Sequence, residues 1–523
     1  MGEPFVRQVT KNISEVQLAR GIAIDLNTRL NNNDIALLAK ANISTSFANV
    51  KDFGAKGDGV TDDTLAIQTC INQVGLYSGI YFPPNSYVNG IATFYKVTTL
   101  NIPDLKHGLR FLGAGQLHST IKFSGTVGIS VGSEMTSFKS ICLIGAGIGT
   151  GATYTNTIMF KDTRPNTRAD FDIKLSETYI QNVETAISTQ GRGVVVDNCD
   201  FYAIRSQIMN VDFPLLATFE AGTEDTQTYA SGFRGFIFRN NRSHYCTCWI
   251  INNVGANSHN LSGVLITDNQ LEGSTGYING YVRHAIIKNN LHIECGNIRD
   301  ALFVLDGCEN VDIDVNISGK SLAVEGGTVP QFCNRLLLCT GAYKNLNVKA
   351  NIEDVKYEVL DFEAGGKNLV VDINCSNICA QGIGYGMLKL NGNYTYDGLT
   401  VRGTISSPNP TFIAVKSSAT LVQNYSVNLD ITGTFLSYDN LDGTKIGASR
   451  KTLTGVYQGN GNATQKILLP YYASTIQVYS TAFNGMVSSS SASLSPALVI
   501  GSDGLQVSGE ANNSNYVYGY VVN

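Results

Sequence analysis

The sequence predicts an all-β fold built as a single-stranded parallel solenoid, and three observations lead to this prediction. Ten segments share one template, in which a Gly, Asn, Asp or His precedes apolar residues one and three positions later and a small polar residue six positions later. The template recurs every 21 to 42 residues. Only 15% of the 523 residues are charged, while 53 are Gly. Stacked coils, in which most residues face a core or a tight turn, have this pattern and composition.

Composition also excludes several classes of protein. With 43% hydrophobic residues, the chain buries enough apolar surface to fold, so it is not disordered. No apolar run approaches a membrane span, and a net charge of −5 without a Lys/Arg cluster argues against nucleic acid as a partner. The first residues lack a secretory apolar segment, which predicts synthesis in the cytoplasm. The 11 cysteines lack zinc-like spacing, so we expect buried thiols, no metal and no cofactor.

The N-terminal part predicts two helical elements ahead of the solenoid. Residues 1–45 are expected to form a helical neck or anchor, because apolar residues recur every four positions between Leu18 and Leu30. A second helix is expected over 62–75, capped by Thr61 or Asp62. Its apolar side would consist of Leu65, Ile67 and Ile71. We expect this helix to plug the end of a solenoid domain that spans 46–446.

The templated segments are predicted to be strands with one buried face, because their apolar residues alternate. They begin at Asp170, Gly193, Gly235, Gly263, His284, Asn310, Asn345, Asn368, Gly398 and Asn424. The small polar position is occupied by Ser176, Cys199, Asn241, Asn269, Asn290, Asn316, Asn351, Asn374, Thr404 and Asp430. Six successive Asn residues indicate side-chain amides that stack from coil to coil in a buried corner.

Two further features assign different roles to the faces of the solenoid. In the middle coils the outward residue of the templated strand is apolar, which indicates burial against another subunit. These residues are Val195, Ile237, Leu265 and Ile286. The strand that precedes each template start instead has polar outward residues, namely Asn252, Asn279, Asp306, Thr340 and Asn391. That second strand is expected to border a binding groove.

The glycine-rich segment from Val50 to Gln68 resembles the opening motif of the pectate-lyase superfamily of right-handed parallel β-helices. The pectinase motifs Gly-His-Gly and Trp-Ile-Asp-His are missing, and the chain is more similar to bacteriophage tailspikes that act as capsular polysaccharide depolymerases. Residues 453–470 and 515–522 resemble the β-sandwich that ends many phage tail fibres, so 447–523 is expected to be such a domain.

The resemblance implies a homotrimer that binds and depolymerises a bacterial capsular or O-antigen polysaccharide. It also implies a place in the virion, on the phage tail, with action at the bacterial cell surface. The N-terminus would attach to the tail or to another tail protein.

Glycosidic hydrolysis needs two carboxyl groups, about 5 to 5.5 Å apart for retention of configuration and about 6.5 to 9.5 Å for inversion. Neighbouring coils lie about 4.8 Å apart, so carboxylates at equivalent positions one or two coils apart come near these separations. His244 and Glu272 lie nine positions after the starts of successive coils, and Glu294 lies ten positions after the next start. Glu272 and Glu294 are the first candidates for acid and base or nucleophile, and Asp306 is expected to face the same groove.

Other residues supply alternatives that the sequence leaves open. The longest insertion contains Glu220, Glu224 and Asp225, a second choice of catalytic acids. Sugar contacts are expected from aromatic and cationic side chains, namely Trp249, Tyr229, Tyr281, Arg239 and Arg242. A polysaccharide lyase would instead need a base and a cation, for which His244, Arg239, Arg242, Arg283 and His284 are candidates. A receptor-binding spike without catalysis is a further alternative, whereas an esterase is disfavoured because no Gly-x-Ser-x-Gly motif occurs.

Overall fold

The structure is a computed structural model, and it is described here for part of the chain. The described residues are 47–88, 91–147, 157–164, 170–189, 192–211, 233–254, 261–273, 275–293, 301–318, 333–378, 386–392, 394–407, 413–419 and 421–432, and the strands 453–458, 464–467, 475–479, 484–488, 498–501, 504–508 and 517–522. The predicted neck, residues 1–45, lies outside them.

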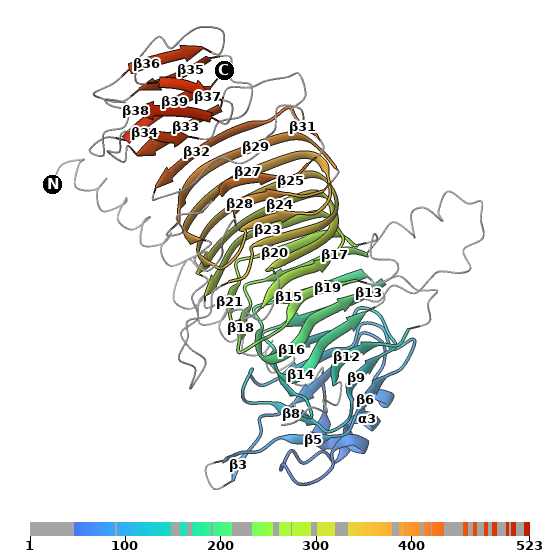
Figure 1. Cartoon of the computed structure of the whole chain (residues 1–523). Helices are drawn as coiled ribbons and strands as arrows, with labels where there is room; N and C mark the ends of the chain where they lie inside the picture. Colours follow the sequence, from blue (N-terminus) through green and yellow to red (C-terminus); the bar gives the residue numbers. More distant parts are fainter. Residues whose placement is uncertain are drawn as a thin grey trace, which may run out of the picture.

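The chain winds as a long parallel β-helix, as predicted (Figure 1). Each coil contributes to three parallel sheets that run the length of the solenoid. The first sheet begins with β1 (Phe47–Asn49), β2 (Gly79–Phe82), β7 (Arg110–Gly113) and β10 (Ser137–Lys139), which precede the template. It continues with the templated strands β13 (Asp170–Ser176), β15 (Arg192–Asp197), β17 (Phe233–Arg239), β20 (Leu261–Thr267) and β32 (Ser426–Thr432).

The second and third sheets follow the first in each coil. The second contains β5 (Tyr95–Val97), β8 (Thr120–Phe123), β11 (Cys142–Ile144), β14 (Tyr179–Thr189), β16 (Asp200–Val211), β18 (Arg242–His244) and β21 (Gln270–Glu272). The third contains β6 (Leu100–Ile102), β9 (Val127–Val131), β12 (Ile158–Asp162), β19 (Trp249–Asn253), β22 (Gly276–Gly280), β26 (Leu360–Phe362), β28 (Gly386–Leu390) and β30 (Ile413–Ser417).

Later coils have longer, continuous strands that bend from one sheet into the next. These are β23 (Val282–Ile293), β24 (Phe303–Ser318), β25 (Leu337–Val355), β27 (Gly366–Ile378) and β29 (Thr395–Ser406), with the short β31 (Leu421–Gln423) beside β29. Strands β3 (Tyr87–Val88) and β4 (Ile91–Ala92) form a separate hairpin.

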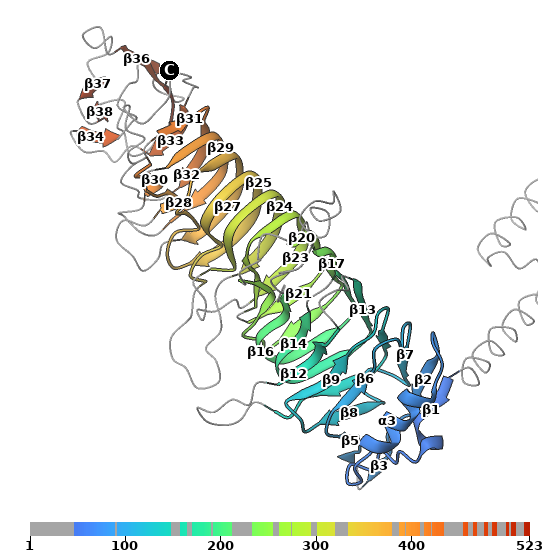
Figure 2. The ribbon, with the colours of Figure 1, turned by 90° about the vertical axis from the view of Figure 1, so that its right-hand side faces the viewer.

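The predicted helix lies at the N-terminal end of the solenoid as α3 (Thr64–Gln73), after a short 3-10 helix (Val50–Phe53) (Figure 2). The side chain of Gln68 bonds both backbone groups of Asn101 in β6, which fixes the helix to the first coils. Asp63 directly precedes the helix, and its buried carboxylate accepts hydrogen bonds from two backbone N–H groups of the preceding loop. The carboxylate of Asp62, one of the two predicted caps, accepts a hydrogen bond from the backbone N–H of Thr64, the first residue of the helix. The expectation for Leu65 was wrong, because its side chain is 79% exposed.

The start of each templated strand is a backbone corner. Nine of the ten start residues have φ between +51° and +83°, a left-handed conformation that Gly and Asn adopt more easily than other residues. The apolar residues that follow fill the interior, as predicted; for example, Val194, Phe236 and Val264 are buried in successive coils. The repeated start residue is therefore explained by backbone geometry.

The six Asn residues form two ladders, of which only one is buried. Asn241, Asn269 and Asn290 are buried as predicted, and each side chain accepts a hydrogen bond from the backbone N–H of the equivalent residue one coil earlier. Each also donates to a carbonyl of an earlier coil. These three form the inner ladder.

The prediction was wrong for the other three. Asn316, Asn351 and Asn374 are exposed, and their amides bond one another on the outside of the solenoid. We call these three the outer ladder. The cause is a register shift between β23 and β24, where Asn290 pairs with Val315 and Asn316 pairs with Leu291. A shift of one residue moves a strand side chain to the opposite face.

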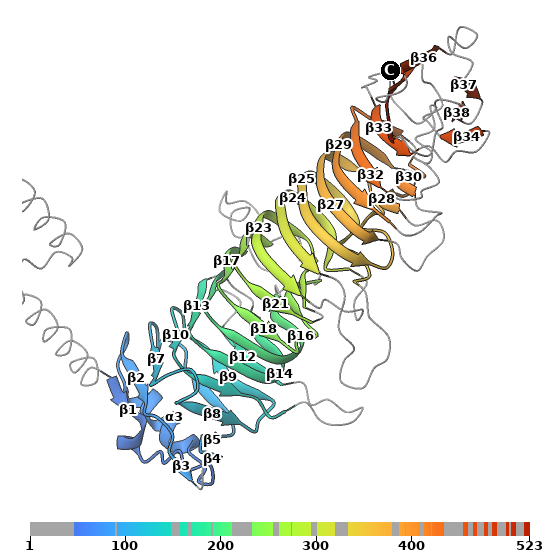
Figure 3. The same ribbon diagram turned by 90° about the vertical axis from the view of Figure 1, so that its left-hand side faces the viewer.

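The C-terminal strands are antiparallel and lie at the end opposite α3 (Figure 3). One sheet joins β33 (Leu453–Gln458), β39 (Val517–Val522), β35 (Thr475–Tyr479) and β36 (Asn484–Ser488), and another joins β34 (Thr464–Ile467), β38 (Gly504–Ser508) and β37 (Leu498–Gly501). That these sheets pack as a β-sandwich, and that domain boundaries fall near 46 and 446, stay predictions.

Two smaller predictions concern cysteines and membranes. Nine cysteines in the described residues are buried free thiols, as expected. No helix in this part of the chain has the length and apolar character needed to cross a membrane.

Candidate functional site

The outer face of the second sheet carries two parallel rows of side chains. The first row runs through Asp200, Arg242, Gln270, Leu291, Asn316, Asn351, Asn374 and Thr404. The second row runs through Tyr202, His244, Glu272, Ile293, Ser318, Glu353 and Ser376. Residues between the rows, such as Phe201, Leu271 and Ile317, are buried, so the rows point outward. This face is where the candidate chemistry gathers.

His244 and Glu272 meet across two neighbouring coils, as their spacing predicted. The Nδ1 atom of His244 lies 2.6 Å from Oε2 of Glu272, and a hydrogen bond joins them. Their side chains are 37% and 28% exposed, so solvent reaches both. A carboxylate held by an imidazole in an accessible position is an arrangement that acid–base chemistry uses. Glu294 directly follows Ile293, which pairs with Glu272, but Glu294 itself lies outside the described residues.

Two tyrosines beside this pair were not singled out by the sequence analysis. Tyr202 pairs with His244 in the adjacent coil, and the Tyr202 and Tyr245 rings meet edge to face at 5.4 Å between centroids. Tyr245 is 71% exposed and has a left-handed φ of 51°. Tyr202 is half-buried, so the exposed ring of Tyr245 offers most of the aromatic surface that suits the apolar face of a sugar. The position of Tyr245 directly after His244 was the available signal.

The two predicted arginines lie on different sides of a corner and are both paired. Arg242 makes two hydrogen bonds, of 2.8 and 3.3 Å, to the carboxylate of Asp200 on the second sheet. Arg239 lies on the first sheet and donates to Asp197 at 2.9 Å, and this contact lowers the pKa of Asp197. Asn240, in a left-handed conformation, separates the two arginines. Only Arg242 therefore belongs to the face that holds Glu272.

The remaining predicted residues fall elsewhere or lie outside the described residues. Trp249 is 8% exposed, and its ring lies against Gly276, where a Cβ would come within 2.3 Å of it. Asp306 is exposed on β24 at the end of the third-sheet segment, paired with Gly341, so strand β22 separates it from Glu272. Tyr281 is half-buried at the next corner, and burial raises its pKa. Glu220, Glu224, Asp225 and Tyr229 lie outside the described residues.

The lyase candidates His284 and Arg283 lie at the start of the first-sheet segment of β23. His284 is exposed with a left-handed φ of 51°, and its Nδ1 lies 3.4 Å from the amide of Asn310. Both residues are a sheet away from Glu272, and His284 occupies a template start, which supports a structural role for it.

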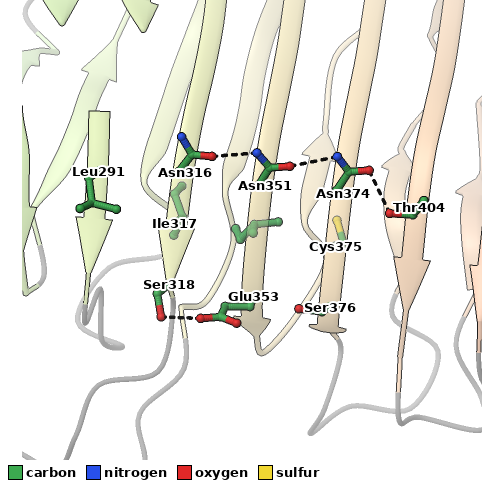
Figure 4. A pocket seen from close by; sticks show the side chains of 11 residues that line it. Leu291, Asn316, Ile317, Ser318, Asn351, Glu353, Asn374, Cys375, Ser376 and Thr404 are labelled. Carbon is green, nitrogen blue, oxygen red and sulfur yellow. Dashed lines mark hydrogen bonds between the residues drawn. The ribbon is translucent and has the colours of Figure 1, made fainter. Parts of the chain in front are cut away.

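Farther along the same face, the outer ladder lines a cavity of about 400 Å³ (Figure 4). Asn351 donates to Asn316 at 2.7 Å, Asn374 to Asn351 at 2.9 Å, and the Thr404 hydroxyl to Asn374 at 2.9 Å. Below this line, Ser318 donates to Glu353 at 2.7 Å. The cavity is thus lined by hydroxyl, amide and one carboxyl group, together with Leu291, Ile317, Ile352 and Cys375.

A second pair of acids, missed by the sequence analysis, lies on the third sheet. Glu358 and Asp361 contact both Arg335 and Lys389 at 3.2 to 3.6 Å, and burial raises the pKa of Asp361. Their side chains are only 3% and 2% exposed. Two cations neutralise two carboxylates that solvent barely reaches, so this cluster is a buried ion-pair network and not an open site.

Within the described ranges, no group of three or more His, Cys, Asp or Glu side chains could hold a metal ion.

Comparisons with known proteins agree with the predicted resemblance at the N-terminal end. Residues 47–173 match a family model described as rhamnogalacturonase A/epimerase, pectate lyase-like. A probable glucan endo-1,3-beta-glucosidase of Arthroderma benhamiae is 38% identical over 91 residues, which is 14% of this chain and 10% of that protein. A non-secreted LysM effector of Penicillium expansum is 38% identical over 92 residues, 14% of this chain and 7% of that protein. The chain thus spans a tenth or less of these two relatives.

Similar solved structures have low identity. A double mutant of the tailspike protein of E. coli bacteriophage HK620 has 10% identity, a TM-score of 0.44, and coverage of 92% of this chain and 94% of that chain. The catalytic unit of an α-1,3-glucanase from Streptomyces thermodiastaticus has 13% identity, a TM-score of 0.37, and coverage of 74% and 64%. The surface adhesin PfbA of Streptococcus pneumoniae has 14% identity, a TM-score of 0.41, and coverage of 75% and 93%.

The segment that carries the predicted opening motif therefore lies within a match to a pectate lyase-like family, and the coils that follow it continue as a parallel β-helix.

Proposed function

We propose that the protein is a phage tailspike enzyme that recognises a bacterial capsular or O-antigen polysaccharide and depolymerises it by hydrolysis. The observation that carries this proposal is the His244–Glu272 contact of 2.6 Å on an accessible, polar face of the β-helix. The family model that matches residues 47–173 is named for enzymes that act on glycans, which supports the substrate class.

In this proposal Glu272 acts as base or nucleophile and Glu294 as general acid. Glu294 directly follows Ile293, the cross-coil partner of Glu272. Coils repeat about every 4.8 Å, so carboxyl groups one or two coils apart come near the separations of about 5 to 9.5 Å that glycosidases require. His244 holds the carboxylate of Glu272 in position. Tyr202 and Tyr245 provide aromatic surface for the sugar on the neighbouring coils.

The hydrogen-bonded ion pair between Arg242 and Asp200 favours hydrolysis over β-elimination. A lyase needs a cation to neutralise the carboxylate of a uronic acid, and the guanidinium of Arg242 already has two hydrogen bonds to Asp200. Glu220, Glu224 and Asp225 remain the second choice of catalytic acids.

The assembly is part of the proposal. The outward residues Val195, Ile237, Leu265 and Ile286 line up across four coils, as their register requires. Ile286 is 45% exposed, which supports burial of this stripe in a homotrimer. Residues 1–45 would attach the spike to the phage tail or to another tail protein, which places the protein in the virion.

The test is the substitution Glu272→Gln in the full chain. Purified capsular and O-antigen polysaccharides are digested, and polymer size is followed by size-exclusion chromatography. Loss of a general acid or base lowers the rate about 100-fold or more, so we expect a loss of this size with an unchanged oligomer. Glu309→Gln is the matched control, because Glu309 lies on the first sheet and pairs with Lys344. Full activity of the Glu272 variant would overturn the site, and binding of a polymer without any shortening would favour a non-catalytic spike.

A further inference from the structure

We infer that the outer ladder is a second binding site on the same face, built for an uncharged stretch of the polysaccharide. The inference rests on the proposed function, because it assigns the substrate class of that glycan-binding face. It concerns Asn316, Asn351 and Asn374, which are about two to four coils beyond Glu272 along the solenoid.

The ladder presents a row of hydrogen-bond donors to solvent. Each side-chain nitrogen of Asn351 and Asn374 uses one N–H for the preceding amide oxygen, which leaves a second N–H on each. All three side chains are exposed, and Figure 4 shows them in one line. Donors repeated at about 4.8 Å suit the hydroxyl and acetamido oxygens of successive sugars.

The cavity beside the ladder has the mixed lining that a sugar requires. Leu291 forms an apolar wall at one end and is 48% exposed, although most leucines of the solenoid are buried. Ser318 and Glu353 supply polar contacts on the other side of the ladder. A pyranose ring has an apolar C–H face and a polar rim, so it matches such a lining.

The charge of the face disfavours an anionic ligand. In the two outward rows, Asp200, Glu272 and Glu353 are acidic, and Arg242 is the one Arg or Lys among the described residues of these rows. The imidazole of His244 is hydrogen-bonded to Glu272. Arg242 is bonded to Asp200 and so does not offset the other two acids. A uronate-rich or sulfated chain would meet net negative charge, whereas a neutral chain would not.

The first-sheet halves of the same long strands provide an internal contrast. There the outward residues form ion pairs, among them Lys288–Asp312, Lys349–Asp314 and Arg402–Asp372. The outer ladder contains no charged side chain. An amide ladder also occurs at the strand starts, where Asn345 donates to Asn310 and Asn368 donates to Asn345. The outer ladder differs from it in lining a cavity, and this cavity is the reason to assign it a neutral ligand.

The ladder and Glu272 are placed to hold one glycan chain. Gln270, two residues before Glu272, pairs with Leu291, which in turn pairs with Asn316. Two coil spacings are about 10 Å, so the ladder begins about that far from Glu272 along the axis. The bound polymer would therefore run lengthwise, with its neutral part on the amides.

The test compares the binding of different polysaccharides to a variant that is expected not to cleave them. Full-length Glu272→Gln protein is titrated by calorimetry with neutral and with uronate-bearing capsular and O-antigen polysaccharides. We expect a neutral polymer to bind best, with little dependence on salt. Adding Asn351→Leu and Asn374→Leu should weaken binding about tenfold for each amide removed, because each loses a hydrogen bond to the ligand. Asn347→Leu is the matched control, since Asn347 lies on the same strand but bonds Asp312 on the first sheet.

Each outcome has a distinct meaning. Unchanged affinity of the double Asn variant, with cleavage by the unsubstituted protein intact, would overturn this inference and leave the proposed function standing. Preferred binding of a uronate-bearing polymer would also overturn it. Tenfold losses in a protein that never shortens any polymer would support the ladder and contradict hydrolysis.

Discussion

The inner and outer Asn ladders have the same residue at the same offset of the template, yet they differ in burial and in the groups to which they are hydrogen-bonded. In the inner ladder, Asn241, Asn269 and Asn290 are at most 2% exposed and bond backbone groups of other coils. In the outer ladder, Asn316, Asn351 and Asn374 are exposed. Their side chains are hydrogen-bonded to one another and to the hydroxyl of Thr404.

The difference comes from one backbone residue per coil. Asn240, Asp268 and Asn289 adopt left-handed conformations and turn the chain directly before each inner Asn. Such a corner leaves backbone groups outside the sheet ladder, and the buried amide satisfies them. From β24 onward the strand runs straight through this point, so Val315, Ala350 and Ile373 occupy the inward position. In these coils, a buried Asn side chain therefore occurs where a corner leaves backbone groups without a partner in the sheet.

The largest effect is expected from Asn269→Ala in the middle of the inner ladder. This change leaves the buried N–H of Asn241 and the carbonyl of Phe238 without partners. At roughly 1 to 3 kcal/mol for each unsatisfied group, we expect a loss of about 4 kcal/mol in the free energy of unfolding. Denaturant unfolding measures it. A loss below about 1 kcal/mol would mean that the corner does not depend on the amide.

A smaller effect is expected from His292, an inward polar residue between the two ladders. It is fully buried, its Nε2 lies 2.8 Å from the carbonyl oxygen of Gly273, and burial lowers its pKa from 6.5 to about 4. The unfolded chain therefore binds a proton in this interval and the folded chain does not. Stability should be fully present above pH 6.5 and should fall by about 3 kcal/mol as the pH approaches 4.

The control for this pH dependence is His292→Gln, which removes the titrating group and keeps a donor for Gly273. Its free energy of unfolding, measured at several pH values between 4 and 7, should change less than that of the unsubstituted protein. Equal slopes for the two proteins would show that His292 is not the source.

The third change, Val315→Asn, places an amide at the position equivalent to Asn290 in a coil without the corner. Val315 is fully buried and pairs with Asn290. With no backbone group left over, the new amide has no partner, and we expect a loss of about 2 kcal/mol in the free energy of unfolding. Unfolding of the Val315→Ala variant separates the cost of the polar group from that of the smaller volume. A neutral or stabilising Asn would contradict the explanation of the inner ladder.

The sequence was informative about the solenoid because alternation and recurrence are local properties. The apolar positions of the template are buried from Val194 to Val401, and the start residues are corners because their side chains tolerate positive φ. The inward or outward direction of the Asn residues could not be predicted in the same way. It depends on whether the residue before the Asn adopts a left-handed conformation and turns the chain, and the spacing of the template does not reveal that conformation.

The candidate site was predicted in part for a similar reason. His244 and Glu272 were paired correctly because they follow their template starts by the same number of residues in adjacent coils. Asp306 is exposed on the strand that precedes a template start, as predicted, but this strand belongs to the third sheet and not to the face that holds Glu272. Glu358 and Asp361 were missed because their burial depends on Arg335 and Lys389, which are distant in sequence.

The smallest effect on stability, and the sharpest contrast with Asn269→Ala, is expected from Asn351→Ala in the outer ladder. Its side chain bonds Asn316 and Asn374, but all three amides face solvent, and water replaces the lost bonds. We expect a change within about 0.5 kcal/mol in the free energy of unfolding by denaturant. A loss near that of Asn269→Ala would mean that the outer ladder supports the fold. If Asn351→Ala leaves stability unchanged but lowers glycan affinity, the outer amides bind the ligand, whereas the inner amides stabilise the backbone corners.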